Sequence, residues 1–238
     1  MRLARVLVAA AWCAGVASNA RAMEVLRSEA GPATEKGLYA LDAEVLLDTR
    51  PAALRHVLVN LCDHRKRMDH LSYCKVFKAE GVRSWSYAMV ELPVLDPRDY
   101  VIASTVEKEL HADGTGIYRS CWDLTPGEGP APRKGILRLQ VNHGCWTLAP
   151  AADGKRTLVH YEVTLAPGGV IPAWAAGYVA RRTLPDYMRL MEKLSREADA
   201  RGVPSHDPSQ PWAGTNVAPL EKVLPAPHPP LPMPAFVP

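Results

Sequence analysis

The sequence predicts an α+β fold in which a curved antiparallel β-sheet is wrapped around a long C-terminal α-helix. Strand-like segments follow one another through the middle of the chain with one short helix among them, and a long amphipathic helix comes last. Turn signals such as Asp113-Gly114 and Asp153-Gly154 separate neighbouring strands. Strands that are segregated from helices favour an antiparallel sheet. The terminal helix must then place its apolar stripe on that sheet.

Hydrophobic periodicity together with capping and turn residues gives the individual elements. A short helix is expected over Ala52–Leu61, with Thr49 as its cap and Pro51 in its first turn. A long helix is expected over Pro172–Ser195, with a kink at Pro185. The expected strands are Met23–Ser28, Gly37–Leu47, Cys74–Ala79, Arg83–Glu91, Tyr100–Glu109, Gly116–Trp122, Gly135–Leu148 and Arg156–Leu165.

Residues 1–22 have the pattern of a secretory signal peptide. Arg2 and Arg5 precede an apolar run, and Ala20-Arg21-Ala22 offers a small-x-small cleavage site. We therefore expect export to the periplasm or secretion, with a mature chain that begins at Met23. Three of the chain's 28 basic residues lie in this segment, which leaves the mature chain nearly neutral against 25 acidic residues. Such a balance gives no indication of a nucleic-acid partner.

The other end of the chain differs in composition from the centre. From Gly202 onward it contains 11 of the 22 prolines and no sustained apolar periodicity. Proline removes backbone donors and ends helices and central strands, so we expect a Pro-rich, disordered tail over residues 199–238. A passive tail is favoured over a Pro-rich ligand for a partner. Residues 23–198 then form one domain, which we expect to be monomeric.

Four cysteines remain after the signal peptide is removed: Cys62, Cys74, Cys121 and Cys145. In an oxidising compartment they favour two disulfides, for which three connectivities are possible. Cys62–Cys74 is the most natural pair because it joins a helix end to a strand start, and Cys121–Cys145 follows by elimination. The rival interpretation is a zinc site at Cys62, His64, His70 and Cys74, but this spacing matches no standard ligand pairing. We therefore expect no metal.

Catalytic motifs are missing from the sequence. It has no GxSxG elbow, HExxH, GxGxxG or phosphate-binding loop, and its histidines are scattered. We therefore expect no catalytic residues, no cofactor and no enzymatic activity.

A family resemblance is carried by several motifs in the right order. DHRKRMD at 63–69 is followed by Trp85, by PRDYV at 97–101, by GILRLQ, by DGKRTLVHYEV and finally by APGGVIPAWAAGYVARRTLPDYMRLM. This ordered set resembles the START (StAR-related lipid-transfer) domain family within the helix-grip, Bet v 1-like superfamily, and most of all its phosphatidylcholine-transfer-like members. The resemblance covers about residues 23–198. A mature chain that begins at Met23 leaves almost no room for the long N-terminal helix that many members of this family have.

The resemblance implies that the protein binds a lipid or other hydrophobic small molecule, with transfer, sensing and storage of that molecule all left open. The ligand would lie in a cavity closed by the C-terminal helix, with transient membrane contact for loading. Phospholipid, fatty acid, sterol and hopanoid-like ligands all remain open. The alternative is a hydrolase- or cyclase-like enzyme that uses the same cavity, since helix-grip relatives include enzymes.

The resemblance also suggests ligand-binding residues. Arg65 would meet a head-group phosphate, and Asp69 would orient it if the local backbone were helical; a solvated surface pair is the competing interpretation. Arg98 and its neighbour Asp99 are expected mainly to stabilise the start of a strand, and ligand contact is the less favoured interpretation. Asn142 stands where an aromatic cage for a choline group would need another ring, which argues against selectivity for choline. The aromatic residues expected to line the cavity are Trp85, Tyr100, Trp146, Tyr161, Trp174 and Tyr178.

Overall fold

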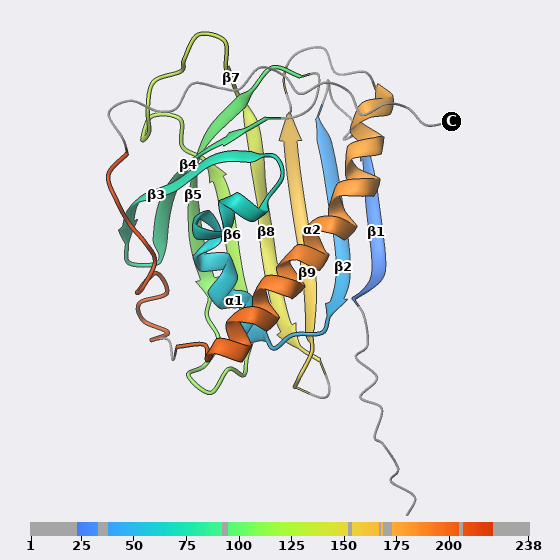
Figure 1. The fold of residues 1–238 in the computed structure, drawn as a ribbon, viewed down its shortest axis with the longest axis vertical. Coiled ribbons are helices and arrows are strands. Elements are labelled where there is room, and N and C mark those ends of the chain that lie inside the picture. Colours follow the sequence, from blue (N-terminus) through green and yellow to red (C-terminus); the bar gives the residue numbers. More distant parts are fainter. Residues whose placement is uncertain are drawn as a thin grey trace, which may run out of the picture.

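The computed structural model describes residues 23–32, 38–91, 95–151, 154–166, 168, 173–204 and 207–220, and for residues 31–32 and 173–182 it describes the backbone alone. Within these residues a nine-stranded sheet wraps around a long helix, which confirms the predicted α+β helix-grip fold (Figure 1). The elements are β1 (Glu24–Pro32), β2 (Tyr39–Leu47), α1 (Pro51–Val59), the 3-10 helix η1 (Leu61–Arg67), β3 (Leu71–Glu80), β4 (Arg83–Val90), β5 (Arg98–Lys108), β6 (Tyr118–Leu124), β7 (Leu137–Arg138), β8 (Val141–Pro150), β9 (Thr157–Ala166) and α2 (Ala173–Arg201).

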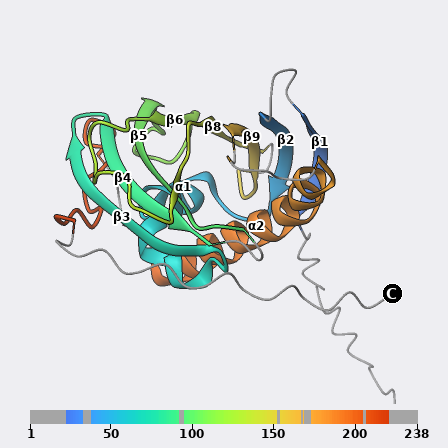
Figure 2. The ribbon, with the colours of Figure 1, turned by 90° about the horizontal axis from the view of Figure 1, so that it is seen from above.

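The strand order is β1-β2-β9-β8-β6-β5-β4-β3, and every pair along this path is antiparallel. The short strand β7 pairs with the start of β5 in parallel. The sequence prediction of one strand over Gly135–Leu148 is therefore wrong, because that segment divides into β7 and β8. Figure 2 shows the sheet curving from β1 to β3 with both helices on its concave side.

The main hydrophobic core lies between this concave face and the helices. Along β2, alternate residues from Tyr39 to Leu47 are buried, as expected for a strand with one covered face. α2 runs through Pro185 and contributes a buried stripe at helical spacing, and each such side chain contributes roughly 1.5–3 kcal/mol when fully buried. The stripe consists of Leu184, Met188, Met191, Leu194 and Ala198.

The N-cap of α1 lies one residue later than expected. Pro51 occupies the first turn as predicted, but Arg50, not Thr49, is the N-cap, and its side chain makes no capping hydrogen bond. Thr49 is buried instead, and its carbonyl accepts a 2.6 Å hydrogen bond from the Thr157 hydroxyl of β9. The cap prediction was wrong because Thr49 joins the sheet layer.

A second, smaller hydrophobic cluster covers the opposite face of the sheet at β3, β4 and β5. It contains Tyr73, Tyr87, Met89 and Val101, with Ile136 packed over them from the segment that leads into β7. Beside it, Asp99 pairs with Arg138 through two hydrogen bonds of 2.7 and 3.0 Å and accepts a 2.9 Å bond from Tyr87. At these strands the outer face of the sheet is therefore covered, and the helices partly cover the concave face.

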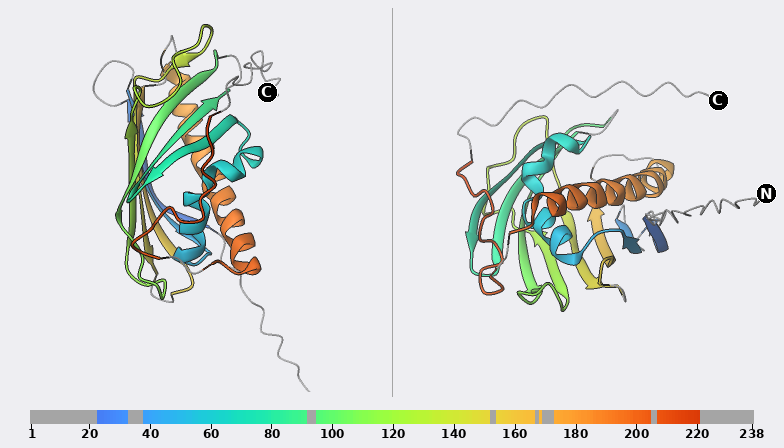
Figure 3. Two further views of the ribbon diagram at one scale, coloured as in Figure 1. Left: turned by 90° about the vertical axis from the view of Figure 1, so that its left-hand side faces the viewer. Right: turned by 60° about the horizontal axis from the view of Figure 1, so that its bottom comes forward.

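Part of the expected tail packs against the domain. Residues 207–220, the C-terminal segment, run beside β3, where Val217 bridges Val76 (Figure 3). Trp212 packs on the main core and Leu220 on the smaller cluster. The carbonyl of Pro211 accepts a 2.6 Å hydrogen bond from Arg55, which is buried with its partner Glu109. The expectation that the fold ends near residue 198 therefore differs from the structure over this segment, whereas residues 1–22 and 221–238 lie outside the described residues.

Both expected disulfides are present. Cys62–Cys74 ties η1 to β3, and Cys121–Cys145 joins directly opposite positions of β6 and β8. No helix in the described part of the chain is long and apolar enough to cross a membrane.

Candidate functional site

The concave face of β5 keeps accessible surface, although it lies on the helix side of the sheet. Ser104 pairs with Trp122, which packs on the main core, so Tyr100 and Ile102 share the concave face by strand alternation. All three β5 residues are only half-buried, whereas the intervening Val101 and Ala103 on the other face are buried. The helices thus cover β2 more closely than they cover β5.

Aromatic rings from three strands and α2 meet on this face. Tyr161 of β9 lies 4.5 Å from Trp146 of β8 and 6.0 Å from Trp122 of β6, measured between ring centroids. Tyr187 of α2 lies 5.9 Å from Trp146 and 6.2 Å from Tyr161. The indole nitrogen of Trp122 donates a 3.0 Å hydrogen bond to Asn142. We call Trp122, Trp146, Tyr161 and Tyr187 the aromatic cluster.

Three phenols are strongly desolvated, those of Tyr161 and Tyr187 in the aromatic cluster and that of Tyr100 on β5. Burial raises the pKa of Tyr100 to about 12. Burial, and secondly the neighbouring Tyr100 phenol, raises the pKa of Tyr161, and burial followed by both other phenols raises the pKa of Tyr187 well above its usual value. The three hydroxyls therefore stay neutral at physiological pH. They can offer hydrogen bonds to a ligand without carrying charge.

Arg98 lies at the edge of the concave face, at the start of β5. It is 4% exposed and donates to the main-chain carbonyls of Asp96 and, at 3.4 Å, of Gly168. Burial lowers the pKa of Arg98. Because Gly168 lies between β9 and α2, Arg98 connects the start of β5 to the chain that leads into the long helix.

η1 does not form the expected Arg65–Asp69 pair. The 3-10 helix ends at Arg67, and Asp69 lies exposed in the following turn. Arg65 is half-buried and donates a 3.3 Å hydrogen bond to the carbonyl of Ser72 in β3. The i, i+4 geometry required a regular α-helix, which this segment does not adopt. A phosphate contact by Arg65 remains a prediction.

The other predicted aromatic residues fall into two groups. Trp85 is buried on the opposite face of the sheet, with Lys78 and Arg83 over its ring at 4.3 and 5.0 Å, so it does not join the aromatic cluster. Trp174 and Tyr178 lie where the structure describes only the backbone. Tyr100, Trp146 and Tyr161 are therefore the predicted cavity aromatics that the structure brings together.

Sequence reasoning missed Trp122 and Tyr187 as site residues. Tyr187 was recognisable on the apolar stripe of the last helix, but that stripe alone does not separate core from site. Trp122 follows Cys121, and a disulfide between Cys121 and Cys145 on one face would have placed Trp122 on the other face beside Trp146 by alternation.

The zinc alternative loses its two sulfur ligands, because Cys62 and Cys74 are bonded to each other. Among the described side chains, Asp42, His160 and Glu162 on the outer face are close enough to share a metal ion. Arg27 already lies 2.5 Å from Asp42, and His160 lies 3.1 Å from the other oxygen of that carboxylate. The Asp42 carboxylate is thus already paired with Arg27 and His160.

Comparison with known proteins finds relatives that match most of the folded part of this chain. No family model matches the chain. An uncharacterized protein of Pseudomonas aeruginosa is 40% identical over 43% of this chain, a match that spans about half (48%) of that relative's length. The phosphatidylcholine transfer protein of Bos taurus is 30% identical over 165 residues, which cover 67% of this chain and 74% of the bovine protein. The chain belongs to the START domain family.

Solved START structures agree with this assignment. The STAR-related lipid transfer protein of Xanthomonas axonopodis matches with a TM-score of 0.61 and 25% identity, over 76% of this chain and 97% of that one. Human STARD10 matches with a TM-score of 0.60 over 81% of this chain and 84% of its own, and at 16% identity it supports the fold alone. The resemblance predicted from the ordered motifs is confirmed.

Proposed function

We propose that this START protein binds one lipid molecule between the concave face of its sheet and α2, and transfers it between membranes. The observation that carries the proposal is a combination of properties at Tyr100, Tyr161 and Tyr187. Protein surrounds these phenols closely enough to raise their pKa, yet each residue keeps accessible surface. Phenols that are desolvated and yet belong to residues with accessible surface support a space inside the domain, which we call the interior hollow.

The lining of the interior hollow favours an apolar ligand. We propose that the aromatic cluster, Tyr100 and Ile102 face it, which is the composition typical of small-molecule sites with few polar groups. Each acyl CH₂ removed from water contributes roughly 0.8 kcal/mol, so an acyl chain of ordinary length contributes on the order of 10 kcal/mol. A carrier must therefore enclose the chain completely and open only at a membrane.

α2 and the chain before it are the proposed lid. α2 supplies Tyr187 to the aromatic cluster, and Arg98 holds the carbonyl of Gly168 just before the helix. Movement of the part of α2 that precedes Leu184 would uncover the hollow without disturbing the stripe from Leu184 to Ala198, which packs on the core. The names of the bovine and Xanthomonas relatives support lipid as the cargo.

We further propose that the protein works as a monomer outside the cytoplasm. The signal-like pattern of residues 1–22 supports export, and the two disulfides are the bonds that an oxidising compartment maintains. An exported carrier of this size would move lipid across an aqueous gap between two membranes.

The test uses two substitutions one residue apart on β5. Ser104→Trp places an indole into the interior hollow, whereas the matched control Thr105→Trp places it on the outer face. Protein purified from the exported fraction is extracted with organic solvent and the extract is analysed by mass spectrometry; transfer of fluorescent phospholipid between vesicles is measured in parallel. We expect about one lipid per chain for the wild type and Thr105→Trp, and at least a tenfold loss for Ser104→Trp. Equal lipid content and transfer in both folded variants would contradict the site.

The same extract distinguishes a carrier from an enzyme. We propose that the lipid leaves the protein chemically unchanged, because the side chains that we propose to line the hollow are neutral phenols and indoles. Incubation of the purified protein with the extracted lipid should return that lipid alone. A new product that accumulates with time and disappears on replacing Tyr100 or Tyr161 with Phe would favour the enzyme alternative.

A further inference from the structure

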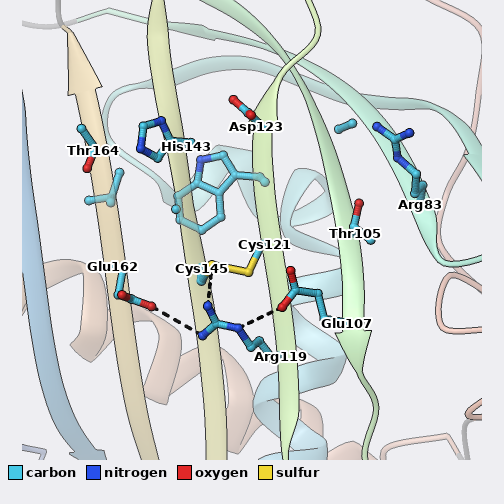
Figure 4. Close-up of a pocket in the computed structure, with 14 residues that line it drawn as sticks. Arg83, Thr105, Glu107, Arg119, Cys121, Asp123, His143, Cys145, Glu162 and Thr164 are labelled. Atoms are coloured by element: carbon cyan, nitrogen blue, oxygen red, sulfur yellow. Dashed lines mark hydrogen bonds and ion pairs between the residues drawn. A yellow bond between two sulfur atoms is a disulfide. The ribbon is translucent and has the colours of Figure 1, made fainter.

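The disulfide Cys121–Cys145 lies on the outer face of the sheet, away from the interior hollow. Its cysteines occupy directly opposite positions in β6 and β8, and both are only half-buried. A surface hollow of about 650 Å³ opens above them and is lined by both cysteines (Figure 4). The bond is thus accessible to a reagent or to a side chain of another protein.

One sulfur of this pair has a cationic neighbour. Nη2 of Arg119 lies 3.2 Å from Sγ of Cys145, and in the described structure no such contact is present at Sγ of Cys121. The guanidinium is held in place by Glu107 at 3.0 Å and Glu162 at 3.5 Å (Figure 4). It also donates to the Thr147 hydroxyl at 2.8 Å. The two sulfur atoms are therefore chemically unequal.

This inequality determines how the bond would break. In thiol–disulfide exchange a thiolate attacks one sulfur and the other leaves as a thiolate, and the better-stabilised thiolate leaves faster. A guanidinium beside a sulfur stabilises its thiolate. The other charged groups that line the hollow are Glu107 of β5, Asp123 of β6, Glu162 of β9 and Arg83 of β4, with His143 of β8. Both glutamates are already paired with Arg119, which still presents one nitrogen to Cys145.

We propose that Cys121–Cys145 is a site of thiol–disulfide exchange with a protein dithiol of the Cys-x-x-Cys oxidoreductase class, in which Cys121 is attacked and Cys145 leaves. The partner's first thiolate bonds to Sγ of Cys121, the Sγ–Sγ bond breaks, and its electron pair stays on Sγ of Cys145 beside Arg119. The partner's second thiol loses its proton and attacks the mixed disulfide, which releases Cys121 as a thiolate that takes up a proton. Two electrons pass from the dithiol to the pair, and the reverse steps re-form the bond.

The second disulfide provides an internal control. Cys62–Cys74 ties η1 to β3, and in the described structure neither of its sulfurs has a contact with a guanidinium or ammonium group. If the Arg119 contact controls exchange, the two bonds of one molecule should react at different rates. This inference does not depend on the proposed lipid function.

The experiment uses the oxidised full-length chain with limiting dithiothreitol, quenched by alkylation and read out by peptide mass spectrometry. We expect Cys121–Cys145 to be reduced about tenfold faster than Cys62–Cys74. Arg119→Gln should slow this step several-fold, Arg119→Lys should restore most of it, and Arg83→Gln, a cation of the same hollow without a sulfur contact, should leave it unchanged. Equal rates for the two disulfides, or no effect of Arg119→Gln in a variant with wild-type circular dichroism, would overturn the proposal.

A trapping experiment tests which sulfur is attacked. A thioredoxin-type protein whose second active-site cysteine is replaced by serine stops at the mixed disulfide, and tryptic mapping identifies the linked cysteine. We expect the linkage at Cys121. A linkage mainly at Cys145, or no linkage under conditions that trap a known disulfide substrate, would contradict the assignment.

Discussion

Removing the C-terminal segment should destabilise the domain, although its proline content suggests a dispensable tail. The perturbation is a chain that ends at Pro204, compared with a chain that ends at Leu220 and keeps all contacts of residues 207–220. The shorter chain loses the Pro211 carbonyl that accepts a 2.6 Å hydrogen bond from buried Arg55. It also loses the side chains of Trp212 and Leu220, which are half-buried against the two hydrophobic clusters.

The magnitude follows from these contacts. A hydrogen bond to a charged group contributes about 1.5–3 kcal/mol. A fully buried large apolar side chain contributes roughly 1.5–3 kcal/mol, so the two half-buried side chains together contribute on the order of 2 kcal/mol. The total is about 4 kcal/mol, which for a domain of this size lowers Tm by roughly 8–16 °C.

Thermal and urea unfolding, followed by circular dichroism, measure this loss directly. In the chain that ends at Leu220, Trp212→Ala should reproduce part of it. A Tm difference below about 2 °C between the two truncated chains would refute the reasoning, because a difference that small corresponds to less than roughly 1 kcal/mol.

Three further predictions concern Arg65, Asp99 and the pair His56 and His64. Arg65→Ala should weaken phospholipid binding by about 1.5–3 kcal/mol while leaving sterol binding nearly unchanged, as measured by fluorescent-lipid titration; equal losses for both would indicate a collapsed pocket. Asp99→Asn should lower the free energy of unfolding by roughly 3–5 kcal/mol, because it leaves Arg138 buried without its anionic partner, and folded protein should still bind lipid; unchanged urea midpoints would contradict this. Burial, first among the causes, lowers the pKa of His56 and His64 from 6.5, so stability is complete above pH 6.5 and falls as the pH drops below it. Replacing both imidazoles with Gln should flatten that decline between pH 7 and pH 5.5 in urea unfolding, and an unchanged slope would rule the effect out.

The fold could be predicted from the sequence because its strands, turns and last helix each carry local signals. The face of each strand was harder to predict. Trp85 shares one face of β4 with Tyr87 and Met89, which build the second cluster on the outer face, and the polar Ser84 and Ser86 point to the concave face. Alternation indicates which residues share a face, but it does not indicate which face the helix covers. Trp146 and Tyr161 lie on the concave side, whereas Trp85 lies on the outer face, and ligand contact by Trp146 and Tyr161 stays a prediction.

Two other differences arise from tertiary contacts that no local pattern reports. The C-terminal segment has no apolar periodicity, and it is held by isolated contacts at Pro211, Trp212 and Val217. Arg65 and Asp69 have helical spacing, but Cys62–Cys74 ties their segment to β3 and it forms a 3-10 helix followed by a turn. In each case a partner distant in sequence determines the local conformation.

Native mass spectrometry of the exported, purified protein tests the central claim most directly. Under gentle ionisation the account predicts a dominant species whose mass equals one chain with both disulfides plus one lipid, and which releases that lipid on collisional activation. Ser104→Trp should shift the population to the bare chain, whereas Thr105→Trp should keep the complex. A bare chain in the wild type that also fails to take up lipid from vesicles would contradict the proposal that this START domain carries lipid in its interior.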